Sequence, residues 1–316
     1  MKAVVLARGL GTRMRAADPD ARLTDRQRAA ADAGLKAMIP VNGRPFLDYV
    51  LSALADAGVA EVALIVGPDH DEVRRHYAES RPARIDLRFV VQPEARGTAD
   101  AVLAAASWTG GDPFLAMNGD NLYPVDALAR LAALDEPGLL AFERDDLVRT
   151  GNIPGERIQS FAVLEVDAGG YLARIVEKPA SIETEFANLP PEGGSHRDDD
   201  ARRSSRAGDE RHAWTDRPPG GGSPSPIDPV ASATRRKDKV LISMNCWRFD
   251  ARIFEACRHV PRSPRGEFEL PEAVALATTR GVRFRALPAR GPVLDLSRRA
   301  DAADVERRLA GVEPRP

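Results

Sequence analysis

The sequence predicts an α/β fold with a mostly parallel central sheet covered by helices, and two observations carry this expectation. Over the first 180 residues, short β-branched runs alternate with longer amphipathic segments rich in Ala and Leu, a pattern typical of parallel strands joined by helices. The composition of the 316 residues, 43% hydrophobic and 29% charged, provides enough apolar material for a sizeable core. A collagen-like, coiled-coil or wholly disordered chain is excluded.

The first part of the chain divides into expected strands and helices in alternation. Short apolar runs predict strands, and longer amphipathic runs predict helices. In chain order these elements are a strand at 2–7, a helix at 46–57, a strand at 62–66, a helix at 71–80 that starts with an Asp, a strand at 87–91, a helix at 98–106, a strand at 114–117 and a helix at 126–134. The strand at 114–117 runs into a polar tetrad at 118–121. Polar residues at the carboxyl end of such a strand mark a candidate ligand site.

Beyond residue 134 the pattern changes. Residues 160–167 and 171–177 alternate like an antiparallel pair joined by a Gly-Gly turn, which is typical of a hairpin. Two further strands are expected at 240–244 and 247–249.

Residues 188–238 have a different composition, with Pro pairs, three consecutive glycines, mixed charges and almost no periodic apolar residues. Such a segment buries too little surface to offset its ordering entropy. We expect either a disordered insertion there or a binding arm that folds on a partner. The expected organisation is therefore one domain made of 1–187 and 239–316, interrupted by this insertion.

Charge and cysteine content exclude several classes of protein. Lys and Arg number 45 against 47 Asp and Glu, so no global field recruits nucleic acid or an anionic membrane. The apolar runs have strand length and fall far short of the roughly 20 residues that span a bilayer. The first residues carry no cleavage pattern, so we expect a cytoplasmic protein. Cys246 and Cys257 fit neither a disulfide framework nor a zinc site.

A glycine-containing loop follows the first expected strand. Gly9 and Gly11 let the backbone approach a bulky anion. Thr12 offers a hydroxyl donor, and Arg13 can hold phosphate oxygens bidentately. A dinucleotide-binding fingerprint would need Gly where Met14 stands, and a Walker loop would need Lys and Ser or Thr after the glycines. We therefore interpret the segment as a phosphate-binding loop of another kind.

A series of short motifs runs through nearly all of the chain outside the insertion. They are GLGTRM at 9–14, KAMIPVNGRP at 36–45, DYVL at 48–51, QP at 92–93 with GTADA at 97–101, NGD at 118–120, EKP at 177–179, SMN at 243–245, RGEFEL at 265–270 and LD at 294–295. In identity and order these motifs resemble those of the sugar-1-phosphate nucleotidylyltransferases. The resemblance implies a Rossmann-like three-layer α/β/α nucleotidyltransferase fold. It also implies an activity in which the phosphate of a sugar 1-phosphate attacks the α-phosphorus of a nucleoside triphosphate and pyrophosphate leaves.

The resemblance assigns the expected catalytic roles to Arg13, Lys36 and Asp120. Arg13 would hold the leaving end of the triphosphate, and Lys36 would lie near the attacking phosphate or the α-phosphate. Asp120 and Asp295 would bind Mg²⁺, a hard cation that favours carboxylate and phosphate oxygens. Because both substrates are anionic, catalysis mainly requires charge neutralisation and in-line alignment, without a covalent nucleophile.

The same resemblance assigns the binding residues. For the nucleotide they are Gly9, Gly11, Thr12, Gln92, Gly97 and Thr98. The Gln92 amide offers a donor and an acceptor, which suits uracil or thymine, and Gly97 permits close approach of the ring. For the sugar phosphate they are Glu177, Lys178, Asn245 and Arg265.

Several positions depart from the family's pattern. The residues after Asp295 differ from the usual Gly-Thr pair, Asn245 stands where relatives often carry Gly, and Arg8 adds a cation beside the phosphate loop. The connection at 15–34 is longer than usual, with a short helix expected at 25–33. We interpret this connection either as a lid over the nucleotide or as a solvated insertion.

These features favour the transfer of a thymidylyl or uridylyl group from dTTP or UTP to a hexose 1-phosphate. A cytidylyl or guanylyl transferase, a non-hexose acceptor, and a catalytically inactive sensor of nucleotide sugars are alternatives. The missing third glycine disfavours a nicotinamide-dependent oxidoreductase. The expected partners are the nucleoside triphosphate and the sugar phosphate, and analogy with relatives suggests a homo-oligomer.

Overall fold

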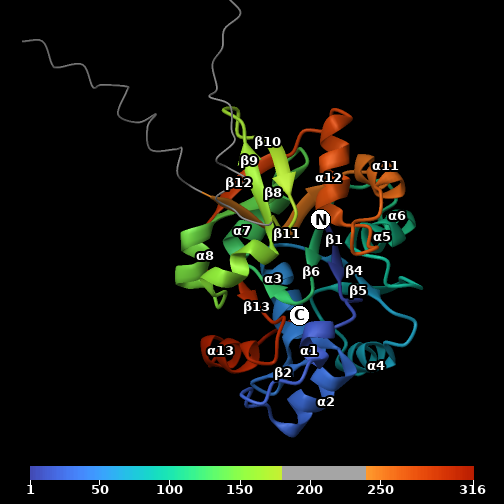
Figure 1. Cartoon of the computed structure of the whole chain (residues 1–316). Helices are drawn as coiled ribbons and strands as arrows, with labels where there is room; N and C mark the ends of the chain where they lie inside the picture. The colour runs from blue at the N-terminus through green and yellow to red at the C-terminus, as the bar shows by residue number, and fades with distance from the viewer. Residues whose placement is uncertain (180–239) are drawn as a thin grey trace, which may run out of the picture. The chain divides into compact units, whose positions relative to one another are not determined.

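The computed structural model of the chain describes residues 1–179 and 240–316, which belong to one compact unit (Figure 1). The segment expected to be disordered, 188–238, lies outside the described residues. No helix within the two described ranges has both the length and the apolar content that a bilayer crossing requires.

A mixed sheet runs through the described part of the chain, in the order β10-β9-β11-β6-β1-β4-β5, with β8 pairing both β11 and β12. Its strands are β1 (Lys2–Leu6), β4 (Glu61–Val66), β5 (Asp86–Val91), β6 (Phe114–Asn118), β8 (Gly138–Glu143), β9 (Ala162–Val166), β10 (Leu172–Val176), β11 (Leu241–Phe249) and β12 (Arg285–Ala289). Strands β5, β4, β1 and β6 are parallel neighbours. Their carboxyl ends therefore meet at one edge of the sheet, where α/β proteins bind ligands.

Helices cover both faces of this sheet, which confirms the predicted α/β class. On one face, α5 (Thr98–Ala104), α11 (Arg252–His259) and α12 (Leu270–Thr279) bury apolar side chains against β1, β4 and β6. Figure 1 shows these three helices grouped together. On the other face, α3 (Phe46–Asp56) packs against α7 (Val125–Ala132), which contacts β6 and β8.

The other described elements are short or peripheral. They are α1 (Thr12–Arg15), α2 (Asp25–Ala33), α4 (Asp71–Ser80), α6 (Ala106–Thr109), α8 (Arg144–Thr150), α13 (Asp301–Arg308), the 3₁₀ helices η1 (Lys36–Met38) and η2 (Gly155–Ser160), and the two-residue strands β2 (Pro40–Val41), β3 (Arg44–Pro45), β7 (Asn121–Leu122) and β13 (Leu294–Asp295).

Strand β11 corrects one prediction. The sequence predicted separate strands at 240–244 and 247–249, whereas β11 continues through both. Its first part lies between β8 and β9, and its last part lies between β8 and β6. Asn245 lies where the partner of β11 changes from β9 to β6, and it has a positive φ of 58°. Asn tolerates this left-handed conformation better than most residues. The polar residue interrupts the apolar pattern but bends the strand instead of ending it.

Both cysteines, Cys246 in β11 and Cys257 in α11, are buried and are free thiols. Burial raises the pKa of Cys257 to about 12, and it raises the pKa of Cys246 still further above its ordinary value. Because the thiolate is the reactive form, we expect neither thiol of the native protein to react with a disulfide reagent at pH 8 within minutes. Both should react at once in guanidinium chloride. Rapid labelling of one thiol in the native state would contradict this placement.

Candidate functional site

A cavity of about 330 Å³ lies at the carboxyl ends of β1, β5 and β6. Nearly all of the predicted site residues line it. They are Gly9, Gly11, Thr12, Arg13, Lys36, Gln92, Gly97, Thr98, Asp120, Glu177, Lys178, Asn245 and Asp295. Residues that are far apart in the sequence thus meet in one place, as expected for motifs that follow the ends of neighbouring parallel strands.

The phosphate-loop candidate at the end of β1 depends on Gly11 for its shape. Gly11 has a φ of 64°, and a Cβ at this position would lie 2.5 Å from the carbonyl oxygen of Gly34. Gly34 ends α2, a helix that begins with a capping box formed by Thr24 and Gln27. The connection at 15–34, which we interpreted as a lid or a solvated insertion, therefore packs through Gly34 against the phosphate-loop candidate.

We expect Gly11→Ala to destabilise the fold by about 2 kcal/mol or more, because a Cβ would combine left-handed strain with a backbone clash. Gly9→Ala is the matched control, since a Cβ at Gly9 has no atom within 4 Å. Urea denaturation of the two variants measures the difference. Equal stability of both would show that the loop does not depend on the contact between Gly11 and Gly34.

Lys36 and Asp120 form an ion pair in the cavity wall. Lys36 begins η1, and its Nζ donates to Asp120 Oδ2 at 3.0 Å. The negative charge of Asp120 is the main cause that raises the pKa of Lys36 above its ordinary value, so this lysine is held as a cation. The cavity therefore has a fixed positive charge beside a carboxylate.

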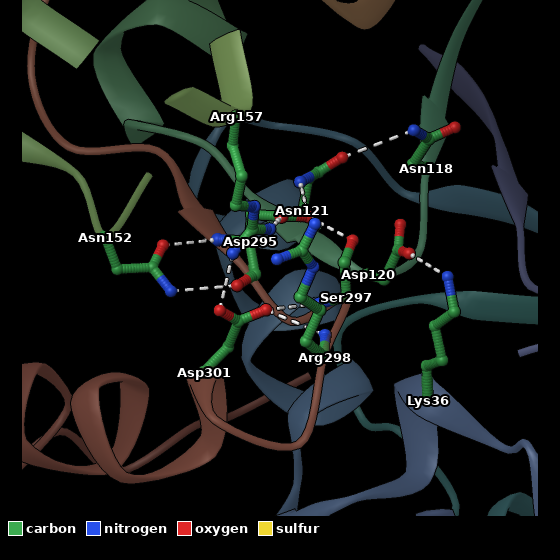
Figure 2. Close-up of polar contacts among 10 residues, drawn as sticks. All are labelled: Lys36, Asn118, Asp120, Asn121, Asn152, Arg157, Asp295, Ser297, Arg298 and Asp301. Atoms are coloured by element: carbon green, nitrogen blue, oxygen red, sulfur yellow. Dashed lines mark hydrogen bonds and ion pairs between the residues drawn. The ribbon is translucent and has the colours of Figure 1, made fainter. Parts of the chain in front are cut away.

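Asp295 lies deeper, in a polar cluster (Figure 2). Its Oδ1 accepts hydrogen bonds from Asn121 Nδ2 at 3.0 Å and from Ser297 Oγ at 2.7 Å, and its Oδ2 accepts from Arg157. Arg157 also donates to Asp301 at 2.6 Å. Burial, helped by the nearby charge of Asp120, raises the pKa of Asp295 to about 6.

Sequence reasoning missed Arg157. This buried residue lies in the 3₁₀ helix η2, where no periodic pattern or motif marks it, and its carboxylate partners lie more than a hundred positions away. Asn121 carried a signal, because it belongs to the polar tetrad that follows β6.

The donor set fits a magnesium ion that also takes oxygens from a substrate. The described residues contain no cluster of three His, Cys, Asp or Glu side chains able to hold a metal, but Mg²⁺ commonly uses one or two carboxylates plus phosphates. Asp120 has only Oδ2 engaged by a described residue. Asp295 accepts three hydrogen bonds out of about four lone-pair positions. Of the two carboxylates, Asp120 therefore has more capacity to bind a cation.

The loop between β5 and α5 forms another wall. Gly97 has a φ of 117°, and a Cβ there would lie 2.4 Å from the backbone oxygen of Phe268. The Thr98 hydroxyl accepts a hydrogen bond from the backbone N–H of Leu270 at 2.9 Å, so it anchors the start of α12. Gln92 also lines the cavity from this wall and is buried.

The predicted sugar-phosphate residues differ in position. Glu177 and Lys178 line the cavity as an ion pair of 3.1 Å, and burial raises the pKa of Glu177. Asn245 reaches the cavity from the bend in β11. Arg265 is not among the lining residues, because its guanidinium pairs with the buried Glu269. The role expected for Arg265 stays a prediction.

Fold and cavity together define an α/β protein with a polar cavity, lined by cationic and carboxylate side chains, at the carboxyl ends of its parallel strands. The chain belongs to the nucleotidyl transferase family, whose model matches residues 2–190.

Individual relatives agree with this assignment. A glucose-1-phosphate thymidylyltransferase of Streptomyces antibioticus is 32% identical over 198 residues, which cover 59% of this chain and 47% of the relative. A UTP–glucose-1-phosphate uridylyltransferase of Haloferax volcanii is 22% identical over 313 residues, covering 98% of this chain and 96% of the relative. A Bacillus anthracis protein solved in complex with sucrose has the same fold, with a TM-score of 0.63 at 16% identity, covering 99% of this chain and 96% of that one. The match to the Streptomyces protein spans about half of that protein's length.

Proposed function

We propose that this protein transfers a nucleoside monophosphate from UTP or dTTP to a sugar 1-phosphate, giving a nucleotide sugar and pyrophosphate. The observation that carries the proposal is the convergence of the glycine loop at 9–11, the cations Arg13 and Lys36, and the carboxylates Asp120 and Asp295 on one cavity. The relatives act on glucose 1-phosphate by name, which supports a hexose 1-phosphate as acceptor. We also propose a cytoplasmic location, and a single catalytic domain made of 1–187 and 239–316 that the segment 188–238 interrupts.

The proposed reaction needs positioning and charge neutralisation from the chain. An oxygen of the sugar phosphate attacks the α-phosphorus while the bond from that phosphorus to the bridging oxygen breaks, and the electron pair leaves with pyrophosphate. Arg13 and the loop N–H groups would hold the leaving phosphates. Lys36, fixed by Asp120, would neutralise the approach of two anions.

Mg²⁺ would be held by Asp120 with Asp295 beside it, and it would supply charge neutralisation for the triphosphate. Glu177 and Lys178, which also line the cavity, would contact the sugar and its phosphate. The half-buried Glu177 carboxylate is suited to accept hydrogen bonds from sugar hydroxyls.

A nucleotide-sugar sensor without turnover is the second candidate. The observation that favours it is the engagement of both Asp295 oxygens by Arg157, Asn121 and Ser297, which leaves little capacity for a metal. Both the transferase and the sensor would bind a nucleotide sugar, but only the transferase would release pyrophosphate.

A matrix of nucleoside triphosphates against sugar 1-phosphates, followed by pyrophosphate release in Mg²⁺ and in EDTA, separates them. We expect release with UTP or dTTP and a hexose 1-phosphate, and none in EDTA or without acceptor. No release from any pair, together with tight binding of a nucleotide sugar by calorimetry, would establish the sensor.

A further inference from the structure

We propose that Asp100 fixes the orientation of the Gln92 side-chain amide and thereby selects pyrimidine nucleotides whose base carries an N3–H, namely uracil and thymine. The inference rests on the proposed function and specifies the base class of its nucleotide. In this role Asp100 is a positioning residue that acts through Gln92.

The Gln92 amide has a defined orientation. Its Nε2 donates to the carbonyl oxygen of Gly97 at 3.1 Å and to Asp100 Oδ2 at 2.7 Å. A carbonyl and a carboxylate are acceptors only, so both must face the NH₂ group. A rotation that exchanged Oε1 and Nε2 of Gln92 would place Oε1 against the Gly97 carbonyl and the Asp100 carboxylate, so that acceptors would face each other. The polar atom that this cavity-lining side chain can offer to a ligand is therefore Oε1.

Asp100 is itself held in place. It lies in the first turn of α5, its side chain is 11% exposed, and its Oδ1 accepts from Arg96 Nη2 at 2.6 Å. The backbone of Gln92 is held as well, because Arg8 Nε donates to its carbonyl oxygen at 3.0 Å. Gln92 is thus held at its backbone carbonyl and at its side-chain nitrogen before any nucleotide binds.

An acceptor in this position discriminates between pyrimidines. Uracil and thymine present an N3–H between two carbonyl groups, whereas the N3 of cytosine is an acceptor. Gln92 Oε1 can accept a hydrogen bond from the N3–H of uracil or thymine, but with cytosine it would face another acceptor, the N3 atom. A site built around a directed hydrogen bond rejects an analogue that lacks the matching donor, because a buried polar group is then left unpaired.

The test is the ratio of kcat/KM for UTP to that for CTP. Asp100→Asn keeps the shape of the side chain, but its amide can donate or accept, so it allows both orientations of Gln92. We expect the ratio to fall roughly tenfold or more relative to the wild type. Glu94→Gln is the matched control, because it neutralises an exposed carboxylate of the same loop and should keep the ratio.

A second readout requires no turnover. Calorimetric titration with UDP and with CDP should show that the wild type prefers UDP and that Asp100→Asn loses most of this preference. An unchanged preference in Asp100→Asn, or a wild type that binds both equally, would overturn the proposal. If the wild type releases no pyrophosphate from any pair yet prefers UDP in an Asp100-dependent way, the proposed reaction fails while the role of Asp100 stands.

Discussion

Asp120→Asn should lower kcat/KM for pyrophosphate release by about 10²–10³-fold or more while leaving the fold intact. The change removes one negative charge from the carboxylate with the most capacity to bind a metal, and removing a charge that acts in the transition state typically costs this much. It also removes the main cause of the raised pKa of Lys36. Stability should change little, because the pair with Lys36 is partly exposed, at 21% for both side chains.

Asp112→Asn is the control for that experiment. Asp112 also pairs with a lysine, Lys2, at 2.8 Å, but on the surface outside the cavity. Its substitution should leave kcat/KM within twofold of the wild type. Steady-state kinetics and thermal unfolding of both variants provide the measurements. A normal rate for Asp120→Asn would remove Asp120 from the proposed chemistry.

The parts of the fold that the sequence predicted are those governed by local pattern. The alternation through residue 134 predicted each strand of the parallel group β5-β4-β1-β6, and the short helix expected at 25–33 is α2. The helix expected at 98–106 divides at Ala105 into α5 and α6. Strand β8 was missed although its run at 138–143 is apolar, because a short apolar run without alternation does not separate a buried strand from a helix.

The candidate site was predictable from the sequence where it depends on motifs at strand ends, and it was not predictable where it depends on side-chain packing. Motifs that follow strand ends converge because parallel strands end together, as the loops after β1, β5 and β6 do in the cavity. The roles of Lys36 and Asp120 were expected from the family resemblance, and their ion pair was not predicted. Contacts such as the one between Gln92 and Asp100 depend on side-chain orientation in a loop, and the sequence alone left both ends of the Gln92 amide open. The partners of Asp295 likewise depend on how η2 packs, which no local pattern encodes.

Arg157→Met should destabilise the fold by about 3–5 kcal/mol, the loss expected when one partner of a buried ion pair is removed. Arg157 is 5% exposed and serves two carboxylates, Asp295 and Asp301, which would be left without their cation. Met fills a similar volume, so the loss reports the uncompensated charges and not a cavity. Arg307→Met is the control, because Arg307 pairs with Asp304 at 2.6 Å but is 74% exposed, and its loss should stay within about 1 kcal/mol.

The pH dependence of the destabilisation caused by Arg157→Met shows whether the unpaired charge of Asp295 is responsible for it. Asp295 already has a pKa raised to about 6 with Arg157 present, and Arg157 is the chief charge that lowers it. Without Arg157 this pKa should rise further. A carboxyl whose pKa is higher in the folded state than in the unfolded state destabilises the fold as pH rises from the unfolded to the folded pKa. Because the folded pKa is about 6 in the wild type and higher in the variant, the extra loss in the variant accumulates above pH 6. Guanidinium denaturation in EDTA should therefore show a larger loss for Arg157→Met at pH 8 than at pH 5. Equal losses at the two pH values would mean that Arg157 acts through packing and not through its charge.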